Sequence, residues 1–237
     1  MTQHTIAGTV LTMPVRVRTA QQHMAMFSVN ADAAQRMIDY SGLQVCRHRP
    51  GKAVVVLMLM HYLDTDLGQY HEYGTNVMVN PPGGQQASGG WKALRSAGGA
   101  FIHHLPVDQA FTLEAGRTIW GGYPKVMADF NIVDGRSFSF DVSIDGTHAV
   151  GMDFSPGLPV PAMFTSRTQV HPTYSHLDGV TRETSGEMRM TGVRYRPGGG
   201  RGCVSVTIPT LGNSPNSASP KGGDVLGIRA ERGHDLR

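Results

Sequence analysis

The segment VMADFNIVDGRSFSFDVSIDGTHAVGMDF, residues 126–154, contains three runs of β-branched and aromatic residues separated by two Asp-Gly pairs. Asp-Gly is favoured in tight type I′ turns, where both central residues take positive φ. The segment therefore predicts three antiparallel strands, connected by turns at Asp134-Gly135 and Asp145-Gly146. The expected strands are residues 126–133, 137–144 and 147–154.

Further strands and two short helices are predicted on either side of this segment. Asn30 is a good N-cap for a helix over residues 31–40, and Gly42 is placed to end it. A second helix is predicted over residues 108–119. Apolar or β-branched runs predict strands at 6–17, 24–29, 52–63, 70–80, 101–105, 162–170, 187–195 and 203–208. The sequence thus predicts an α+β fold with mainly antiparallel strands, which form a barrel or a sandwich.

The composition favours one folded domain followed by a tail. Hydrophobic residues make up 40% and charged residues 16% of the chain, so a sizeable core can form. The 30 glycines favour turns and hairpins over a helical bundle. Residues 81–99 are punctuated by Pro and Gly and predict a loop. We expect a single domain over residues 1–208, whereas residues 209–237, rich in Ser, Pro, Gly and Asn, predict a disordered tail.

Charge and cysteine content argue against several classes of protein. The formal net charge is +3, but no nucleic-acid-binding module accompanies the arginines, so no nucleic-acid partner is predicted. The longest apolar run, residues 53–60, is too short to span a bilayer, and we expect neither a signal peptide nor a membrane partner. The two cysteines, Cys46 and Cys203, are far apart, which fits buried, reduced thiols in a cytoplasmic protein.

One of the four lysines, Lys125, lies in an unusual setting. It follows a proline in WGGYPKVM, residues 120–127, and aromatic and aliphatic residues flank it. Burial disfavours the charged form of an amine, lowers its pKa and releases a neutral nucleophile that can attack a ketone. The alternative is an ordinary lysine at a strand edge, with its stem on Tyr123 and its head in water. Local context alone leaves both interpretations open.

Four motifs around this lysine resemble the acetoacetate decarboxylase family. They are QYHEYG at 69–74, FIHHL at 101–105, EAGR at 114–117 and YPK at 123–125. The family carries a Tyr-x-Glu-x-Gly strand, a Gly-Arg-Glu turn and a Pro-Lys-Lys motif in the same order. A weaker likeness extends to PAMF at 161–164, so the resemblance covers residues 24–170.

The resemblance implies both a fold and a set of site residues. The fold is a cone-like antiparallel β-barrel or curved sheet with added helices, assembled into a homo-oligomer. Lys125 takes the Schiff-base role, and Glu72 takes the position of the active-site glutamate that moves protons or orients the substrate. Tyr123, Trp120 and Arg117 are expected to bind that substrate, a small keto acid. The resemblance implies no cofactor and no metal ion.

The chain departs from the family pattern around the lysine. Val126 stands where the family has a second lysine, and Thr118 replaces the glutamate of Gly-Arg-Glu. One additional residue, at Gly121-Gly122, lengthens the interval before Lys125. Because Lys125 is the only lysine in this segment, the resemblance still assigns it the nucleophile.

A further departure concerns the N-terminal arginine of the family. Its position falls near residues 19–21, where this chain has no arginine, and Arg16 and Arg18 lie just upstream. A small offset would restore the match. True loss of a carboxylate-binding arginine would instead indicate a substrate other than acetoacetate.

The function expected from these residues is that of a carbon–carbon lyase that decarboxylates a β-keto acid through a Schiff base on Lys125. The same iminium could serve an aldolase or dehydratase acting on an α-keto acid, because each reaction needs an enamine at the same carbon. A different class is a non-catalytic barrel that binds a small apolar ligand.

A metal site is the remaining alternative. His61, His71, His103 and His104 lie on or near neighbouring predicted strands beside Glu72, and imidazoles with a carboxylate suit zinc or iron. Against this, His71 and Glu72 are adjacent and should face opposite sides of a strand, as should His103 and His104.

Overall fold

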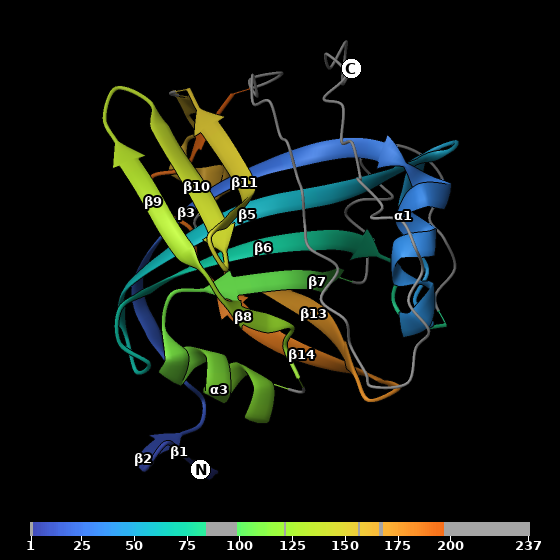
Figure 1. The fold of residues 1–237 in the computed structure, drawn as a ribbon. Helices are drawn as coiled ribbons and strands as arrows, with labels where there is room; N and C mark the ends of the chain where they lie inside the picture. Colours follow the sequence, from blue (N-terminus) through green and yellow to red (C-terminus); the bar gives the residue numbers. More distant parts are fainter. Residues whose placement is uncertain (1, 84–98, 121, 156, 166–167, 197–237) are drawn as a thin grey trace. The chain divides into compact units, whose positions relative to one another are not determined.

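The computed structural model describes residues 2–83, 99–120, 122–155, 157–165 and 168–196 (Figure 1). The chain forms two compact units, Met1–Met127 with Val160–Val193, and Ala128–Pro159 with Arg194–Arg237. The single domain expected over residues 1–208 stays a prediction. The strand expected at 203–208, Cys203 and the tail at 209–237 lie outside the described residues, as does most of the expected loop at 81–99.

The first unit is built on an eight-stranded sheet that curls into a half-barrel (Figure 1). The strand order is β14-β13-β7-β6-β5-β3, while β4 pairs with β5 and β8 pairs with β7. Neighbouring strands are antiparallel, except that β7 is parallel to both β13 and β8. The strands are β3 (Val17–Asn30), β4 (Arg47–Arg49), β5 (Lys52–Thr65), β6 (Tyr70–Val79), β7 (Gly99–Val107), β8 (Lys125–Met127), β13 (Gln169–Leu177) and β14 (Val180–Met188).

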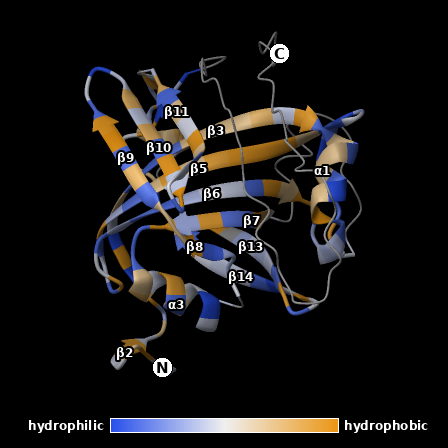
Figure 2. Cartoon of the chain, viewed as in Figure 1, coloured by the Kyte–Doolittle hydropathy of each residue, from blue (hydrophilic) through white to orange (hydrophobic). Residues whose placement is uncertain are grey.

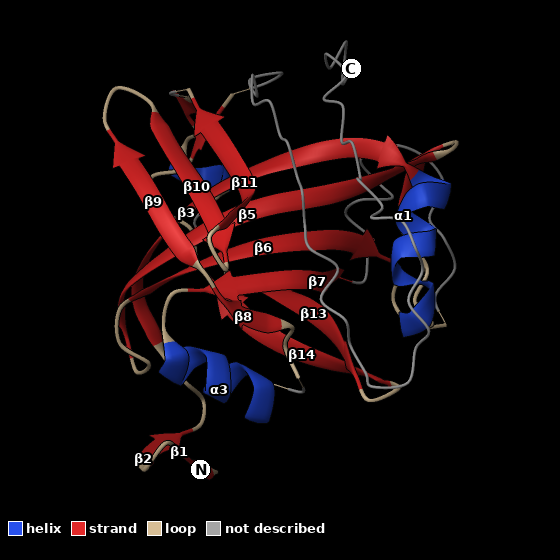
Figure 3. Cartoon of the chain, in the orientation of Figure 1, coloured by secondary structure: helices blue, strands red, loops and turns tan. Residues whose placement is uncertain are grey.

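Two α-helices occur among the described residues, α1 (Ala31–Ile38) and α3 (Ala110–Thr118) (Figure 3). Asn30 caps α1 as expected, because its side-chain oxygen accepts a hydrogen bond from the Ala33 backbone N–H at 2.8 Å. The 3-10 helix η1 (Asp39–Ser41) continues α1 and ends at Gly42. The φ of 73° at Gly42 is a left-handed conformation that glycine adopts readily, so the predicted end of the helix is confirmed.

The strand expected over residues 6–17 is wrong, because a tight turn interrupts it. A hairpin forms instead from β1 (Gln3–Ile6) and β2 (Thr9–Thr12). Ala7 and Gly8 take φ of 45° and 79° in its turn. Alanine seldom takes positive φ, so the sequence carries no clear signal for this turn. The next strand, β3, is much longer than the strand expected over residues 24–29.

The second unit contains the three-stranded sheet predicted from the Asp-Gly pairs. Its order is β11-β10-β9, with β9 (Asp129–Asp134), β10 (Phe138–Ile144) and β11 (Thr147–Phe154). Asp145 and Gly146 take φ of 49° and 73°, which confirms the type I′ turn between β10 and β11. A short pair, β12 (Leu158–Pro159) with β15 (Arg194–Tyr195), also belongs to this unit.

Two expectations about the first strand of this segment are wrong. Asp134-Gly135 is not a type I′ turn: neither residue takes positive φ, and the longer connection is closed by a hydrogen bond from the Gly135 N–H to the Ser137 carbonyl. The expected strand over residues 126–133 is also divided. Its first residues belong to β8 in the first unit, and β9 begins at Asp129 in the second.

A further Asp-Gly pair, Asp178-Gly179, makes a hairpin of β13 and β14 that was not predicted. Both turn residues take positive φ, 52° and 74°. The strands expected at 162–170 and 187–195 are consequently misplaced, and residues Ala162–Phe164 form the 3-10 helix η2. Both strands of the hairpin carry few large apolar side chains, so they lack the pattern that predicts a strand.

Together these elements confirm the predicted fold class, with mainly antiparallel strands, a curved sheet and two short helices. Apolar residues dominate β5, most of which is buried (Figure 2). Leu57 on β5, Val77 on β6 and Phe101 on β7 are among the most deeply buried side chains of the first unit, and Cys46 is buried as expected. Neither α-helix among the described residues has the length and apolar character that crossing a bilayer requires.

Candidate active site

Lys125 opens β8, the strand that pairs in parallel with β7. The preceding Pro124 carbonyl accepts a hydrogen bond from the Leu105 N–H at 3.3 Å, and the Lys125 N–H donates to the Tyr123 carbonyl at 2.7 Å. Arg117, on α3, donates from Nε and Nη2 to the Lys125 carbonyl at 3.1 and 2.7 Å. The backbone of the lysine is therefore held by a strand and a helix together.

The amine of Lys125 lies inside the protein against two polar partners. Its Nζ is 2.7 Å from Oε2 of Glu72 and donates a hydrogen bond to Oγ1 of Thr112 at 2.8 Å. The side chains of the ion pair are only 4% and 9% exposed, so salt screens their attraction little. Nζ also lies 5.4 Å from the centre of the Tyr70 ring, within cation–π range. The amine is therefore enclosed by a carboxylate, a hydroxyl and an aromatic ring.

Glu72 is held at both of its carboxylate oxygens. It lies two residues after Tyr70 on β6, so both side chains point to the same face. Its Oε1 accepts a hydrogen bond from the Tyr62 hydroxyl at 3.2 Å. Tyr62 on β5 is paired in register with Tyr70, and the two rings stack with their centres 4.3 Å apart.

The setting of the two tyrosines raises the pKa of both hydroxyls. Burial raises the pKa of Tyr62 and of Tyr70 well above the ordinary value of a phenol, and the Glu72 carboxylate raises both further. For Tyr70, hydrogen bonds with Thr112 and Tyr62 oppose part of the rise in pKa. Both hydroxyls therefore keep their protons at neutral pH and can donate hydrogen bonds.

Gly116, inside α3, provides space for the stem of Lys125. A β-carbon at position 116 would lie 2.7 Å from both Cδ and Cε of Lys125. Carbon atoms that are not bonded to each other settle at about 3.5–4.0 Å, so no larger residue fits without displacing the lysine. Glycine inside a helix is unfavourable by roughly 0.5–1 kcal/mol relative to alanine. The need for room beside the lysine explains why glycine stands there.

The three residues expected to bind substrate make different contacts. The Arg117 guanidinium contacts the backbone carbonyl of Lys125. The Tyr123 hydroxyl forms hydrogen bonds with Thr173 at 3.1 Å and Thr184 at 2.6 Å, and burial raises its pKa. Trp120 stacks loosely on Tyr123 and packs against an apolar cluster. The cluster consists of Ile6, Leu11, Leu67, Tyr70 and Ala115. Substrate binding by these three residues stays a prediction.

The structure brings Lys125 and Glu72 together and adds three residues that were not expected. Tyr70 already belongs to the Tyr-x-Glu-x-Gly motif, and its even spacing from Glu72 on one strand could have placed it on the same face. Tyr62 and Thr112 reach the site from β5 and α3. No local sequence signal marks either of them.

The first two histidines of the metal hypothesis lie together on β5 and β6. The rings of His61 and His71 are 4.2 Å apart between centres, and Nδ1 of His71 is 2.7 Å from Oδ2 of Asp108. Glu72 is committed to Lys125 instead. Among the described residues, no group of three or more His, Cys, Asp or Glu side chains could hold a metal ion.

The other two histidines, His103 and His104, contact each other, with their Nδ1 atoms 2.6 Å apart. The expectation that they face opposite sides of the strand is therefore wrong. The register of β7 against β6 shifts at this point, and such a β-bulge turns two consecutive side chains to one side. Burial lowers the pKa of His103, and burial together with the neighbouring His103 lowers the pKa of His104 to about 3.

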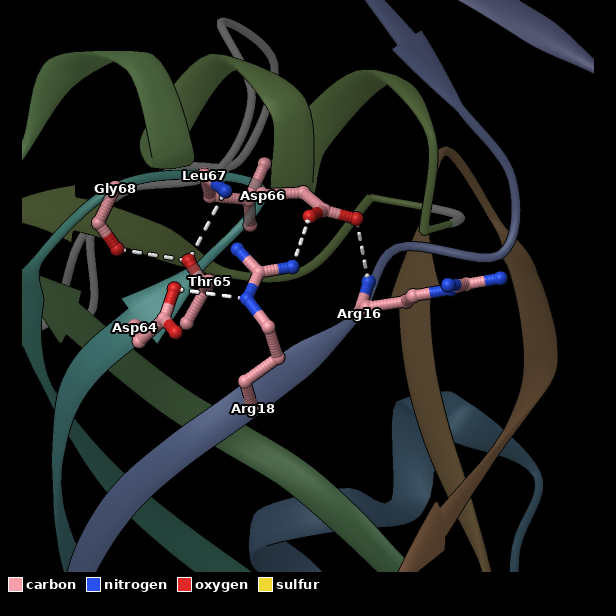
Figure 4. A network of polar contacts seen from close by, with 7 residues as sticks. All are labelled: Arg16, Arg18, Asp64, Thr65, Asp66, Leu67 and Gly68. Atoms are coloured by element: carbon pink, nitrogen blue, oxygen red, sulfur yellow. Dashed lines mark hydrogen bonds and ion pairs between the residues drawn. The ribbon is translucent and has the colours of Figure 1, made fainter.

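Arg18, one of the two arginines upstream of the expected N-terminal position, is bound to two aspartates (Figure 4). Its guanidinium lies 2.8 Å from Asp64 through Nε and 2.6 Å from Asp66 through Nη1. Arg16 donates its backbone N–H to Asp66 at 2.9 Å. The side chain of Arg18 is 47% exposed, so this is a network of surface ion pairs.

The first unit is thus a curved, mainly antiparallel sheet in which a lysine amine is buried against a glutamate carboxylate. The family model described as acetoacetate decarboxylase (ADC) matches residues 4–203, and the chain belongs to that family. None of the curated proteins compared with the chain matches it.

Two solved structures share the fold. The acetoacetate decarboxylase of Legionella pneumophila subsp. pneumophila str. Philadelphia 1 is 17% identical, with a TM-score of 0.52 over 75% of this chain and 67% of that one. A structure from structural studies of acetoacetate decarboxylase is also 17% identical, with a TM-score of 0.55 over 76% of this chain and 70% of that one. At this identity the likeness concerns the fold alone.

Proposed function

We propose that the protein is a Schiff-base-forming lyase that decarboxylates a small β-keto acid. The observation that carries this proposal is the buried contact of 2.7 Å between the Lys125 amine and the Glu72 carboxylate. A buried ion pair is expensive to desolvate and is weak evidence for stability alone. Membership in the acetoacetate decarboxylase family supports a catalytic role for this pair. The expected homo-oligomer and cytoplasmic location stay predictions.

The first step requires a neutral amine. Glu72 accepts a proton from the Lys125 ammonium, so that the ion pair becomes a neutral amine beside a carboxylic acid. The nitrogen lone pair then forms a bond to the ketone carbon of the substrate, and the carbonyl π bond breaks to give a carbinolamine after proton transfer. The hydroxyl leaves as water with the proton held by Glu72, which yields the iminium and returns Glu72 to its carboxylate form.

The iminium then acts as an electron sink. The bond between the α-carbon and the β-carboxylate breaks, carbon dioxide leaves, and the electron pair moves through the carbon–carbon bond to the iminium nitrogen. The product is an enamine on Lys125. Glu72 takes up a proton from solvent and delivers it to the α-carbon, and water hydrolyses the resulting iminium to free ketone and lysine.

The residues around the amine favour a β-keto acid over an α-keto acid. The side chains that contact Nζ are a carboxylate, a hydroxyl and an aromatic ring. A substrate that retains its carboxylate needs a cation to hold it throughout the reaction, and none of these side chains is one. Aldol or dehydration chemistry through the same lysine is the alternative.

The experiment compares the two substrate classes with one enzyme preparation. Carbon dioxide release is measured with acetoacetate, and deuterium exchange into the methyl group is followed by NMR with pyruvate in heavy water. We expect carbon dioxide release that Lys125→Met abolishes and that the control Lys52→Met preserves. Exchange into pyruvate without any decarboxylation would favour the alternative chemistry. Activity that survives Lys125→Met would refute the lysine mechanism.

A further inference from the structure

The Lys125–Glu72 pair has a hydroxyl partner at each end. Nζ of Lys125 contacts Oε2 of Glu72 and donates a hydrogen bond to Oγ1 of Thr112. Oε1 of Glu72, the other carboxylate oxygen, accepts a hydrogen bond from the Tyr62 hydroxyl.

We propose that Tyr62 is a positioning residue, whose hydroxyl holds the Glu72 carboxylate in its ionised form with Oε2 directed at the Lys125 amine. This inference rests on the proposed function and deepens it, because it names the group that controls the catalytic carboxylate. Tyr62 acts through Glu72, since its hydroxyl bonds to the carboxylate oxygen remote from the amine.

The chemistry of a carboxylate explains why such a partner matters. Glu72 has two equivalent oxygens and can rotate, so one fixed donor at Oε1 orients the other oxygen. A hydrogen bond donated to the charged form also favours that form over the protonated acid. Glu72 must be ionised to receive the lysine proton, so Tyr62 extends the pH range in which the first step occurs.

Tyr62 is well suited to be a permanent donor. Burial raises its pKa far above neutrality, so it does not ionise in the working range of an enzyme. Its ring is fixed against Tyr70, at 4.3 Å between centres and 21° between planes.

Tyr62→Phe tests the proposal because it removes only the hydroxyl. From the typical strength of a hydrogen bond to a charged group, we expect the acid limb of the pH profile of kcat/KM for acetoacetate to move to higher pH by about one unit. Below that limb, kcat/KM should fall about tenfold. The matched control is Tyr73→Phe. Tyr73 is a buried tyrosine next to Glu72 in sequence, and its hydroxyl contacts Thr75. The control should leave the pH profile unchanged.

A double-mutant cycle separates this role from a merely structural one. In the Glu72→Gln background, Tyr62→Phe should change the rate of Lys125 adduct formation less than about twofold, because the group through which Tyr62 acts is gone. If Tyr62→Phe does not fold, 3-fluorotyrosine at position 62 keeps the ring and strengthens the donor. The acid limb should then move to lower pH.

The outcomes divide cleanly between this inference and the function on which it rests. A parent enzyme that decarboxylates acetoacetate and forms the Lys125 adduct, with a Tyr62→Phe profile identical to the parent, overturns the role of Tyr62 alone. An equal loss of rate in both backgrounds of the cycle also overturns it. A parent enzyme that never forms an adduct on Lys125 with any keto acid refutes the proposed function, and the role of Tyr62 with it.

Discussion

Gly116→Ala places one additional carbon where the stem of Lys125 lies. The new β-carbon would be 2.7 Å from Cδ and Cε and 3.4 Å from Cγ of the lysine. Relief of this contact requires a displacement of about 1 Å, because carbons settle at about 3.5–4.0 Å. The stem has little freedom to move, since Nζ is held by Glu72 and Thr112. The amine must therefore leave its position or the helix must shift.

The expected result is a loss of activity in a folded protein. A misplacement of about 1 Å at a reacting group can lower the rate by about a hundredfold. Stability should fall by no more than about 2.5 kcal/mol, because alanine improves the helix by roughly 0.5–1 kcal/mol while overpacking costs about 1–3 kcal/mol. Adduct formation by rapid quench and urea unfolding measure the two effects separately.

The control for this prediction is Gly186→Ala on β14, where a β-carbon would meet nothing within 4 Å. It should retain both activity and stability. A folded Gly116→Ala protein that forms the adduct at the parent rate would refute the argument that glycine makes room for the lysine.

Three other substitutions test separate contacts of the structure. Glu72→Gln leaves the buried ammonium of Lys125 without a countercharge, and the free energy of unfolding measured in urea should fall by about 3–5 kcal/mol. An unchanged midpoint of urea unfolding would mean that water reaches the amine. Burial lowers the pKa of His104 to about 3, so the folded state favours the neutral imidazole. The resulting contribution to stability is fully present above pH 6.5, the ordinary pKa of histidine in the unfolded chain, and is lost as the pH falls toward 3. Thermal midpoints should fall across that window in the parent and fall less in His104→Phe; identical slopes would contradict the buried pair. Arg18→Gln should leave kcat/KM for acetoacetate within about twofold, because exposed ion pairs contribute little, whereas a large rise in KM would indicate that Arg18 binds the substrate carboxylate.

The parts of the fold that the sequence predicted depend on local signals. Asn30 caps the start of α1, and Gly42 ends the 3-10 helix η1 that continues it, because capping and left-handed glycine are properties of single residues. Asp145-Gly146 makes its turn for the same reason. The bulge at His103 was not predictable, because it arises from the register between two strands, and a shift of one residue leaves no mark on either sequence alone.

The same distinction applies to the site. Lys125 and Glu72 could be singled out because each belongs to a motif of consecutive residues. Tyr62 could not, because its place beside Tyr70 follows from the pairing of β5 with β6. Thr112 contacts the amine only because α3 packs against β8, which is a matter of tertiary structure. The sequence therefore singled out the two groups proposed to react, and the structure shows which residues contact them.

Borohydride trapping tests the central claim most directly. The full chain is mixed with acetoacetate, reduced with sodium borohydride, digested and analysed by peptide mass spectrometry. The account predicts a stable secondary amine on Lys125, formed only when substrate is present and absent from Lys52. Turnover of acetoacetate without any adduct on Lys125, or an adduct that forms equally on other lysines, would contradict a Schiff base at this residue.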